Sequence, residues 1–222
     1  MSYSADWNTG DSSDNITKLN RLQIGAETDG FTVTRYQQFA AALGSGFAGT
    51  VLDVGSATGR GGEAFRARIP GVTLDGVELV PERAKALEAS SDYRRVYGGV
   101  LQSIDAEPGS YDAILMGEVV EHVPYSELEQ FLSASRRLLV IGGRLLLTTP
   151  NPHYILLKQR SGGSVLGGAH VSVHCAEALS QYLSVLGFTV NSIAGTGKVS
   201  KVIGRRFPLN FYGAYLIDAT AS

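Results

Sequence analysis

The sequence predicts an α/β fold in which a doubly wound, mostly parallel sheet is covered by helices on both faces. Short apolar runs that suit buried strands alternate along most of the chain with segments of helical periodicity. The first clear run starts at Val51 and ends on Asp53, and it leads into a glycine-containing turn and then into the start of a helix. A second run ends on an acid about twenty residues further on, a spacing typical of a nucleotide-binding βαβ unit.

The composition is that of one ordinary globular domain. Its 222 residues suffice for a full α/β core, with 44% hydrophobic and 18% charged residues. The net charge of −2 creates no field that would draw the chain to nucleic acid or to an anionic membrane. The single cysteine, Cys175, cannot form an internal disulfide, and residues 1–20 lack the apolar core of a signal peptide. We therefore expect a cytoplasmic protein without a membrane partner.

The N-terminal part of the chain divides into two predicted regions. Residues 1–30 are expected to form an arm and a short helix, because Met1 to Asp14 are rich in Ser, Asp, Asn and Gly and Asn15 to Ala26 are only weakly patterned. Residues 31–222 are expected to form the folded domain. It begins with a stronger helix at Thr32 to Leu43, where apolar residues recur at helical spacing.

The turn after the first strand indicates the ligand. Gly55 and Gly59 let the backbone approach a ligand closely, but their spacing is not that of a dinucleotide-binding G-x-G-x-x-G turn. Asp53 would repel a pyrophosphate and suits an amino group. The segment resembles the D/E-x-G-x-G-x-G loop of class I S-adenosylmethionine (SAM)-dependent methyltransferases, with Ala57 at the middle glycine. This resemblance implies cofactor contacts from Asp53, Gly55, Ser56, Ala57 and Gly59.

The second strand, Leu74 to Leu79, ends beside a candidate ribose-binding acid. In the family, the acid at this strand end binds both ribose hydroxyls of SAM, which implies cofactor contacts from Glu78 and the adjoining Leu79. A helix then starts at Val80-Pro81, with proline in its first turn.

The third strand, Arg94 to Tyr97, precedes the expected adenine site. Family members have a small residue followed by Asp there, whereas this chain has Gly99 followed by Val100. We therefore expect adenine to be held by apolar packing and backbone groups at Val100 and Leu101, or by Gln102.

The fourth strand, Tyr111 to Met116, leads into a polar cluster. Gly117, next to the strand end, is a further candidate cofactor contact. Glu118, Glu121 and His122 follow at positions i, i+3 and i+4, which would share one face of a helical turn. Two carboxylates and an imidazole suit a divalent ion such as Mg²⁺, Mn²⁺, Co²⁺ or Zn²⁺. They equally suit catalysis by a His122 base that Glu121 orients.

The following segment adds a second resemblance. The E-x-x-E-H motif at 118–122, then T-T-P-N at 148–151 and then His170 resemble the catalytic half of RNA 3′-terminal 2′-O-methyltransferases. This resemblance implies that Glu118, Glu121, His122 and His170 bind a metal ion. After the histidine those enzymes have an acidic-aromatic pair, where this chain has Val173-His174. The resemblance thus favours metal-assisted methylation of a vicinal diol more than it favours RNA.

The remaining elements complete the predicted sheet. A fifth strand at Arg144 to Thr149 precedes a connection, Ile155 to Ala169, whose length of about 15 residues suggests a substrate loop or lid. A helix at Ala176 to Leu186 follows, and then strands at Phe188 to Val190 and Phe211 to Ile217. The family resemblance implies a Rossmann-like, seven-stranded sheet with an antiparallel last strand.

Two further histidines, His153 and His174, are candidates for the base that accepts the proton, although each could be an ordinary surface residue. A basic cluster precedes the last strand; its default interpretation is a solvated face, and the alternative is a site for an anionic acceptor. Its members are Lys198, Lys201, Arg205 and Arg206.

Together these features predict a SAM-dependent O-methyltransferase. It would methylate a hydroxyl of a sugar or saccharide-containing small molecule, assisted by a divalent metal such as Mg²⁺. Two alternatives stay open: an RNA 3′-terminal 2′-O-methyltransferase, and a metal-independent small-molecule enzyme with a histidine base. A small-molecule or oligosaccharide acceptor is favoured over RNA, and a homodimer is compatible with the sequence. Fatty acid, quinone and carboxylate acceptors also fit the C-terminal pattern of a histidine, a helix and then G-F-x-V. A non-catalytic SAM-binding protein would have little reason to keep the polar cluster together.

Overall fold

The structure is a computed structural model that describes all residues except 1–30, 158–163, 167–168, 198–199, 201–203 and 205–206. The predicted N-terminal arm and the helix at residues 15–26 therefore lie outside the described residues. So do the four members of the basic cluster and much of the predicted lid at residues 155–169.

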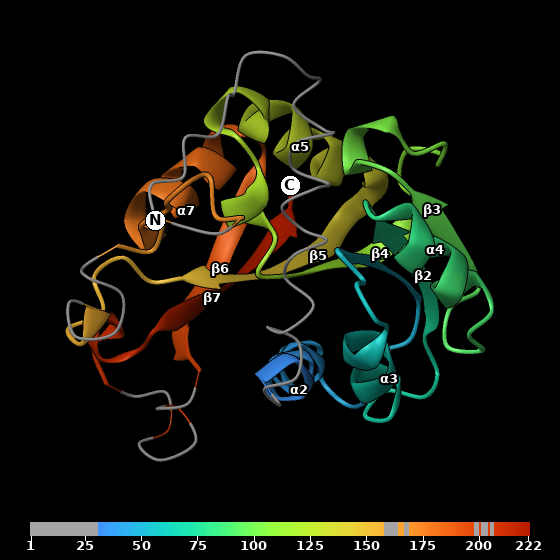
Figure 1. Cartoon of the computed structure of the whole chain (residues 1–222), viewed down its shortest axis with the longest axis horizontal. Helices are drawn as coiled ribbons and strands as arrows, with labels where there is room; N and C mark the ends of the chain where they lie inside the picture. Colours follow the sequence, from blue (N-terminus) through green and yellow to red (C-terminus); the bar gives the residue numbers. More distant parts are fainter. Residues whose placement is uncertain (1–30, 158–163, 167–168, 198–199, 201–203, 205–206) are drawn as a thin grey trace, which may run out of the picture.

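One seven-stranded sheet organises the described chain (Figure 1). The order across the sheet is β3-β2-β1-β4-β5-β7-β6, and the first five strands are parallel. Only β7 runs antiparallel, to both β5 and β6, which confirms the predicted fold class. The strands are β1 (Thr50–Val54), β2 (Thr73–Glu78), β3 (Arg95–Gly98), β4 (Tyr111–Gly117), β5 (Leu139–Pro150), β6 (Phe188–Thr196) and β7 (Ala214–Ala221).

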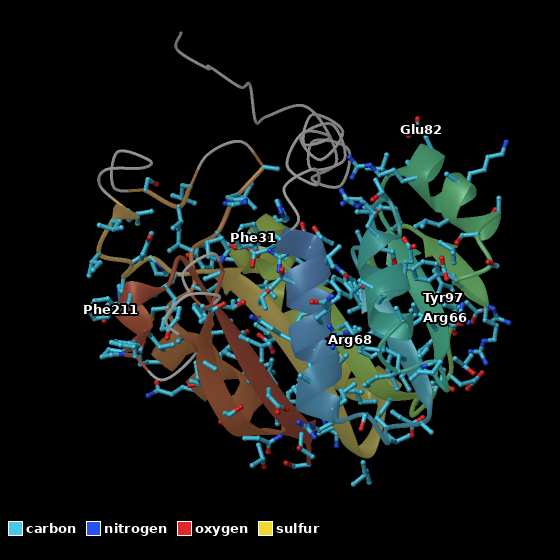
Figure 2. The ribbon with its side chains drawn as sticks, turned by 90° about the horizontal axis from the view of Figure 1, so that it is seen from below. Phe31, Arg66, Arg68, Glu82, Tyr97 and Phe211 are labelled. Atoms are coloured by element: carbon cyan, nitrogen blue, oxygen red, sulfur yellow. The ribbon has the colours of Figure 1, made fainter. Side chains whose placement is uncertain are left out.

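Helices cover both faces of this sheet. In Figure 1, α2 and α3 lie on one side of the strands and α5 and α7 on the other; in Figure 2, seen from the first side, α2 lies across the strands beside α3. The helices are α2 (Phe31–Leu43), α3 (Arg60–Arg66), α4 (Pro81–Glu88), α5 (Tyr125–Leu138) and α7 (Ala176–Val185), with short 3₁₀ turns η2 (Leu101–Ser103), η3 (Val120–His122) and η4 (Leu209–Phe211). Among the described helices, none is both long and apolar enough to cross a bilayer.

Alternation of side chains along the central strands produces two apolar layers. Because successive residues of a strand point to opposite faces, Val51 packs toward α2 and α3 whereas its neighbour Leu52 packs toward α5 and α7. Leu115 and Met116 of β4 divide between the same two layers. All four side chains are fully buried, so these strands read as continuous apolar runs, as expected for a parallel sheet with both faces covered.

Two predicted boundaries near the C-terminus were wrong. The strand predicted to end at Val190 continues to Thr196, because it pairs with β7 over its full length around a register shift between Val190 and Ser192. The last strand begins at Ala214 rather than Phe211, since residues 209–211 form the η4 turn. Strand extent here depends on pairing between distant segments, which the local pattern does not encode.

Candidate active site

A cavity of about 430 Å³ opens at the carboxyl ends of the parallel strands. The order of the strands reverses between β1 and β4, and ligands of doubly wound sheets bind at this point. The walls come from the first turns of α2, the loop after β1, the ends of β2 and β4, and residues near η2, η3 and α5. Its volume is in the range of small-ligand and cofactor sites.

The loop after β1 forms one wall of this cavity. The backbone N–H groups of Gly55 and Ser56 both donate to the Val77 carbonyl, at 2.8 and 3.1 Å, which binds the loop to β2. Gly55 has a φ of 75°, and the Cβ of any other residue there would come within 2.8 Å of Val119. Ala57 also adopts a positive φ, 51°, which explains why family members have glycine at this position. Of the predicted contacts, Gly55, Ser56 and Ala57 line the cavity, and Gly59 does not.

Glu78 joins the loop after β1 to the residues that follow β2. One carboxylate oxygen, Oε2, accepts the Ala57 N–H at 2.8 Å, and the other, Oε1, accepts the Val80 N–H at the same distance. The side chain is almost fully buried, yet it lines the cavity together with Leu79, as predicted for a ribose-binding acid. The glycine loop and the acid are therefore one hydrogen-bonded unit.

Asp53 occupies a different position from the one predicted. Its carboxylate is fully buried, accepts hydrogen bonds from the Tyr36 and Tyr93 hydroxyls, and does not line the cavity. The sequence predicted a direct contact to the cofactor's amino group, and this geometry does not support it. Tyr36 lines the cavity instead, so Asp53 holds α2 against the glycine loop through this residue. This role of Tyr36 was not predictable from the sequence, because the periodicity of the helix indicates only a buried face.

Burial raises the pKa of Asp53 to about 6, and the two tyrosine hydrogen bonds only partly oppose this shift. The folded state therefore binds a proton on the Asp53 carboxylate more tightly than the unfolded state does. Protonation of Asp53 stabilises the folded state fully below about pH 4, and this stabilisation is lost as the pH rises to about 6. The loss is about 3 kcal/mol. Between about pH 4 and pH 6, the free energy of unfolding should therefore fall less for Asp53→Asn than for the wild type. Urea denaturation at several pH values measures both. Identical slopes for the two proteins would contradict the assignment.

The residues predicted to hold adenine also contribute to the cavity wall. Val100, Leu101 and Gln102 all contribute to its lining, and Gly117 lines it next to the end of β4. The Oε1 atom of Gln102 is buried and has no hydrogen-bond partner within the described part of the chain. An adenine amino group is a suitable donor for this oxygen, which lies two residues after Val100, the residue at the position of the family's Asp.

The polar cluster after β4 is only partly as predicted. Glu118 does not share a helical turn with Glu121 and His122, because the turn η3 begins at Val120 and Glu118 itself has a φ of 61°. Its carboxylate lies 3.5 Å from the Arg35 guanidinium of α2. The prediction that Glu118 completes a four-residue metal site is therefore not supported by the geometry.

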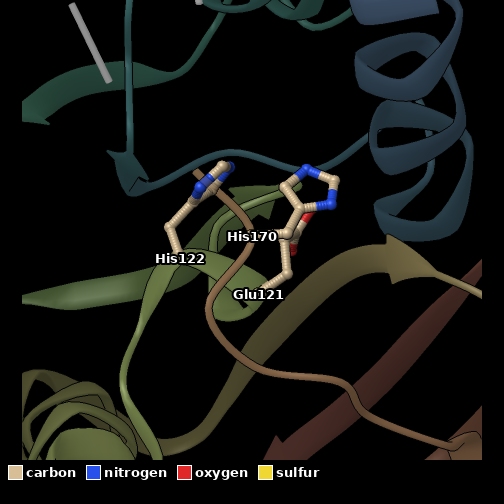
Figure 3. A group of neighbouring side chains, drawn as sticks. All are labelled: Glu121, His122 and His170. Carbon is tan, nitrogen blue, oxygen red and sulfur yellow. The ribbon is translucent and has the colours of Figure 1, made fainter. Parts of the chain in front are cut away.

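Three of the predicted ligands do converge. One ligand atom from each of Glu121, His122 and His170 lies within 4.8 Å of the others, and Figure 3 shows the three side chains close together. The two imidazole rings meet edge to face, with centroids 5.0 Å apart. Both histidines also line the cavity, so the cluster can reach a bound ligand.

Backbone carbonyls hold one nitrogen of each histidine in this cluster. Nδ1 of His122 lies 2.9 Å from the Ala169 carbonyl and must donate to it, as Nδ1 of His170 does to Val165 at the same distance. In the neutral tautomer that this hydrogen bond favours, Nε2 is the nitrogen without a proton, an arrangement common among metal-binding histidines. Burial lowers the pKa of His122, which favours this neutral form.

Glu121 supplies the carboxylate of the cluster. Its Oε2 accepts a hydrogen bond from the Thr149 hydroxyl at 2.9 Å, and its Oε1 is buried without a hydrogen-bond partner among the described residues. Burial, and next the negative charge of Glu118, raise its pKa well above the ordinary value. A cation would satisfy the unpartnered oxygen and offset the buried charge, so the donor set fits a divalent ion.

The segment after His170 determines where this histidine lies. The N–H groups of Val171 and Ser172 donate to the Glu121 carbonyl, at 2.8 and 3.1 Å. The Ser172 hydroxyl and Nε2 of His174 both contact the Val120 carbonyl, at 3.0 and 3.2 Å. His174 is thus buried in the bonds that fix this segment to η3, and it lies outside the cavity lining. The prediction of His174 as a base is not supported by this geometry.

His153 lies away from the cluster. It is exposed in the turn after β5, and it does not line the cavity. The turn is held by Asn151, whose side-chain oxygen accepts the His153 N–H at 3.0 Å. The geometry therefore does not support His153 as the base, and His122 and His170 are the histidines at the cavity.

Comparisons with known proteins agree with this geometry. Residues 29–193 match the model of a family described as a methyltransferase domain. The chain is 29% identical over 161 residues to the mitochondrial ubiquinone biosynthesis O-methyltransferase of Mus musculus, a match that covers 65% of this chain and 42% of the relative. It is 38% identical over 112 residues to the ubiquinone biosynthesis O-methyltransferase of Xanthomonas campestris pv. campestris, covering 46% and 43%. The matched region spans less than half the length of these relatives.

Solved structures share the fold. A 1,6-didemethyltoxoflavin-N1-methyltransferase of Burkholderia thailandensis, solved with S-adenosylhomocysteine, superposes with a TM-score of 0.67 at 17% identity over 95% of this chain and 87% of that one. The small RNA methyltransferase HEN1 superposes with a TM-score of 0.66 at 18% identity, over 85% of this chain and 25% of that one. With the family match over residues 29–193 and the strand order described above, the chain belongs to the class I SAM-dependent methyltransferases.

Proposed function

We propose that this chain is an O-methyltransferase that transfers the methyl group of SAM to a hydroxyl of a sugar or saccharide-containing small molecule, with a divalent ion at Glu121, His122 and His170. The observation that carries the proposal is the convergence of these three side chains beside the cavity that the glycine loop lines, with His122 and His170 in its wall. A hydroxyl beside a second oxygen suits such a site, because the two oxygens can share one cation.

The transfer itself is a displacement at carbon. The acceptor oxygen attacks the methyl carbon of SAM, and the new C–O bond forms as the S–CH₃ bond breaks. The electron pair of that bond stays on sulfur, which gives S-adenosylhomocysteine (SAH), and the hydroxyl proton leaves to a base or to water. The chain contributes mainly by holding oxygen, methyl and sulfur in line.

The three side chains define the kind of ion that would be held. Nε2 of each histidine and the unpartnered oxygen of Glu121 would bind it. Such an ion would lower the pKa of the acceptor hydroxyl and so make its oxygen a better nucleophile. Two imidazole nitrogens favour Mn²⁺, Co²⁺ or Zn²⁺ over Mg²⁺, which prefers oxygen ligands. We therefore favour Mn²⁺, Co²⁺ or Zn²⁺ over the Mg²⁺ that the sequence predicted.

A metal-independent reaction is the second candidate, and the tautomer of His122 favours it. Nδ1 of this residue donates to Ala169, so Nε2 is an acceptor that can take the hydroxyl proton directly. Burial lowers its pKa and keeps the ring neutral at physiological pH, the form that a general base requires.

The names of the curated relatives favour another acceptor. Those proteins are ubiquinone biosynthesis O-methyltransferases, so a hydroxyl on a quinone precursor is the main alternative to a saccharide. Both acceptor classes offer a hydroxyl beside a second oxygen, and both are compatible with a cavity of mixed polar and apolar lining.

Transfer of a labelled methyl group from SAM tests the proposal. The protein is offered separate pools of oligosaccharides, dihydroxylated aromatic compounds and short RNAs, each with and without EDTA. We expect labelling of the saccharides that EDTA abolishes and that Mn²⁺ or Co²⁺ restores better than Mg²⁺. Labelling that is unchanged by EDTA would contradict the role of a divalent ion and would favour His122 as a general base. Labelling confined to the aromatic compounds or to RNA would overturn the saccharide assignment.

A further inference from the structure

Thr149 contacts the three-residue cluster without lining the cavity. It lies near the end of β5, it is fully buried, and its hydroxyl donates to Oε2 of Glu121 at 2.9 Å. The two residues are 28 positions apart in the sequence, so only the tertiary fold brings them together. His122 and His170 line the cavity, whereas Thr149 does not. Thr149 therefore acts on a ligand in the cavity through Glu121.

The hydrogen bond fixes the carboxylate of Glu121. The last torsion of a glutamate side chain is broad, so its two oxygens can exchange places when nothing holds them. Here Thr149 holds Oε2, whereas Oε1 is buried and has no hydrogen-bond partner among the described residues. A threonine suits this task, because its β-branched side chain has few χ1 rotamers and the strand sets the direction of the hydroxyl. Oε1 is thus the oxygen that remains for a cation.

The neighbouring strand holds the other side of the cluster. Tyr215 of β7 lies opposite Thr149 in the register, and both side chains are fully buried. The Tyr215 hydroxyl donates to the His174 carbonyl at 2.9 Å and so holds the segment that carries His170. Residues directly opposite each other on an antiparallel pair point to the same face of the sheet. One face of the sheet therefore fixes both the carboxylate of Glu121 and the segment of His170.

We propose that Thr149 is a positioning residue for the ion site. Its hydroxyl holds Glu121 in the orientation in which Oε1 and the two histidines can bind one divalent ion. The inference rests on the proposed function, because it assigns Thr149 a role only in a site that holds an ion. Hydrogen-bonded partners of metal ligands typically contribute about 10- to 100-fold to metal affinity.

The affinity of the full chain for Mn²⁺ alone tests the inference, without SAM or an acceptor. Electron paramagnetic resonance of the free ion gives the dissociation constant for the wild type and for Thr149→Val, which keeps the shape of the side chain and removes its hydroxyl. We expect the Mn²⁺ dissociation constant of this variant to rise by about tenfold or more. Thr149→Ser keeps the hydroxyl and should stay within about threefold of the wild type. Calorimetry should find SAH affinity within about twofold of the wild type for both variants.

Thr148→Val is the matched control. Thr148 is the preceding residue of β5 and is also fully buried, but its hydroxyl has no hydrogen-bond partner within the described part of the chain. Removal of this hydroxyl should leave Mn²⁺ affinity within about twofold of the wild type. Thermal melting would identify a variant that fails to fold, and Thr149→Ala, which lacks the same hydroxyl, would then replace Thr149→Val.

Three results would contradict the inference. If Thr149→Val bound Mn²⁺ as tightly as the wild type, the role of Thr149 would be wrong and the ion of the proposed function would stand. An equal loss of affinity in Thr148→Val would show a general effect of altering β5, and would also overturn the role of Thr149. If the wild type itself did not bind Mn²⁺, Co²⁺ or Zn²⁺, the ion and the role of Thr149 would be wrong together.

Discussion

His122→Ala should reduce the turnover number by about 10³-fold while changing the affinity for SAH by less than twofold. The imidazole presents an unprotonated Nε2 to the cavity beside Glu121 and His170, and the substitution removes it whether it binds an ion or accepts the proton. This side chain bonds to the Ala169 carbonyl, which lies outside the glycine loop, so SAH binding should persist. Methyl-transfer kinetics and calorimetry with SAH measure the two effects separately.

His153→Ala is the control for this experiment. His153 is an exposed histidine in the turn after β5, and its loss should change turnover by less than twofold. If His122→Ala kept full turnover, or lost SAH binding in parallel with turnover, the catalytic role assigned to the cluster would be wrong. Restored turnover at high concentrations of Mn²⁺ or Co²⁺ would favour the ion over the simple base.

Glu78→Gln should weaken SAM binding by about 100-fold. In the wild type, the two carboxylate oxygens accept the Ala57 and Val80 N–H groups, and they face the cavity where the ribose is expected. An amide replaces one oxygen with a donor, so one backbone N–H loses its acceptor and one ribose hydroxyl loses a charged partner. The variant should therefore lose affinity equally for SAH and for 5′-methylthioadenosine, an adenosine thioether that lacks the amino-acid end of SAH.

Glu82→Gln provides the matched control for Glu78→Gln. Glu82 is an exposed residue in the first turn of α4, close to Glu78 along the chain but outside the cavity lining (Figure 2). Its substitution removes the same charge and should leave both affinities within twofold. If the two variants behaved alike, the effect of Glu78 would be one of net charge and not of the hydrogen bonds described here.

Local chemistry determined much of the fold and of the cofactor site. The alternation of apolar strands with helices predicted the sheet, because burial on both faces requires continuous apolar runs. The positive φ of Gly55 was predictable because a turn that approaches a ligand closely needs glycine. The place of Glu78 was predictable because an acid at the end of the second strand is typical of nucleotide-binding βαβ units. Short-range constraints of this kind depend on residues that are neighbours in the sequence.

Only the tertiary structure decided which charged groups face the cavity. Asp53 is covered by Tyr36 and Tyr93, which lie 17 and 40 residues away in the sequence. His170 joins Glu121 because the segment after it binds to the backbone of η3, and the same bonds bury His174.

Glu118 shows most clearly what the local sequence pattern cannot predict. Its spacing from Glu121 and His122 suits a shared helical face, but its own φ of 61° breaks that turn and directs its carboxylate toward Arg35. The sequence thus determined which residues could do chemistry at this end of the sheet. Packing between distant segments decided which of them meet, because the energy of a buried charge depends on partners that the local pattern does not contain.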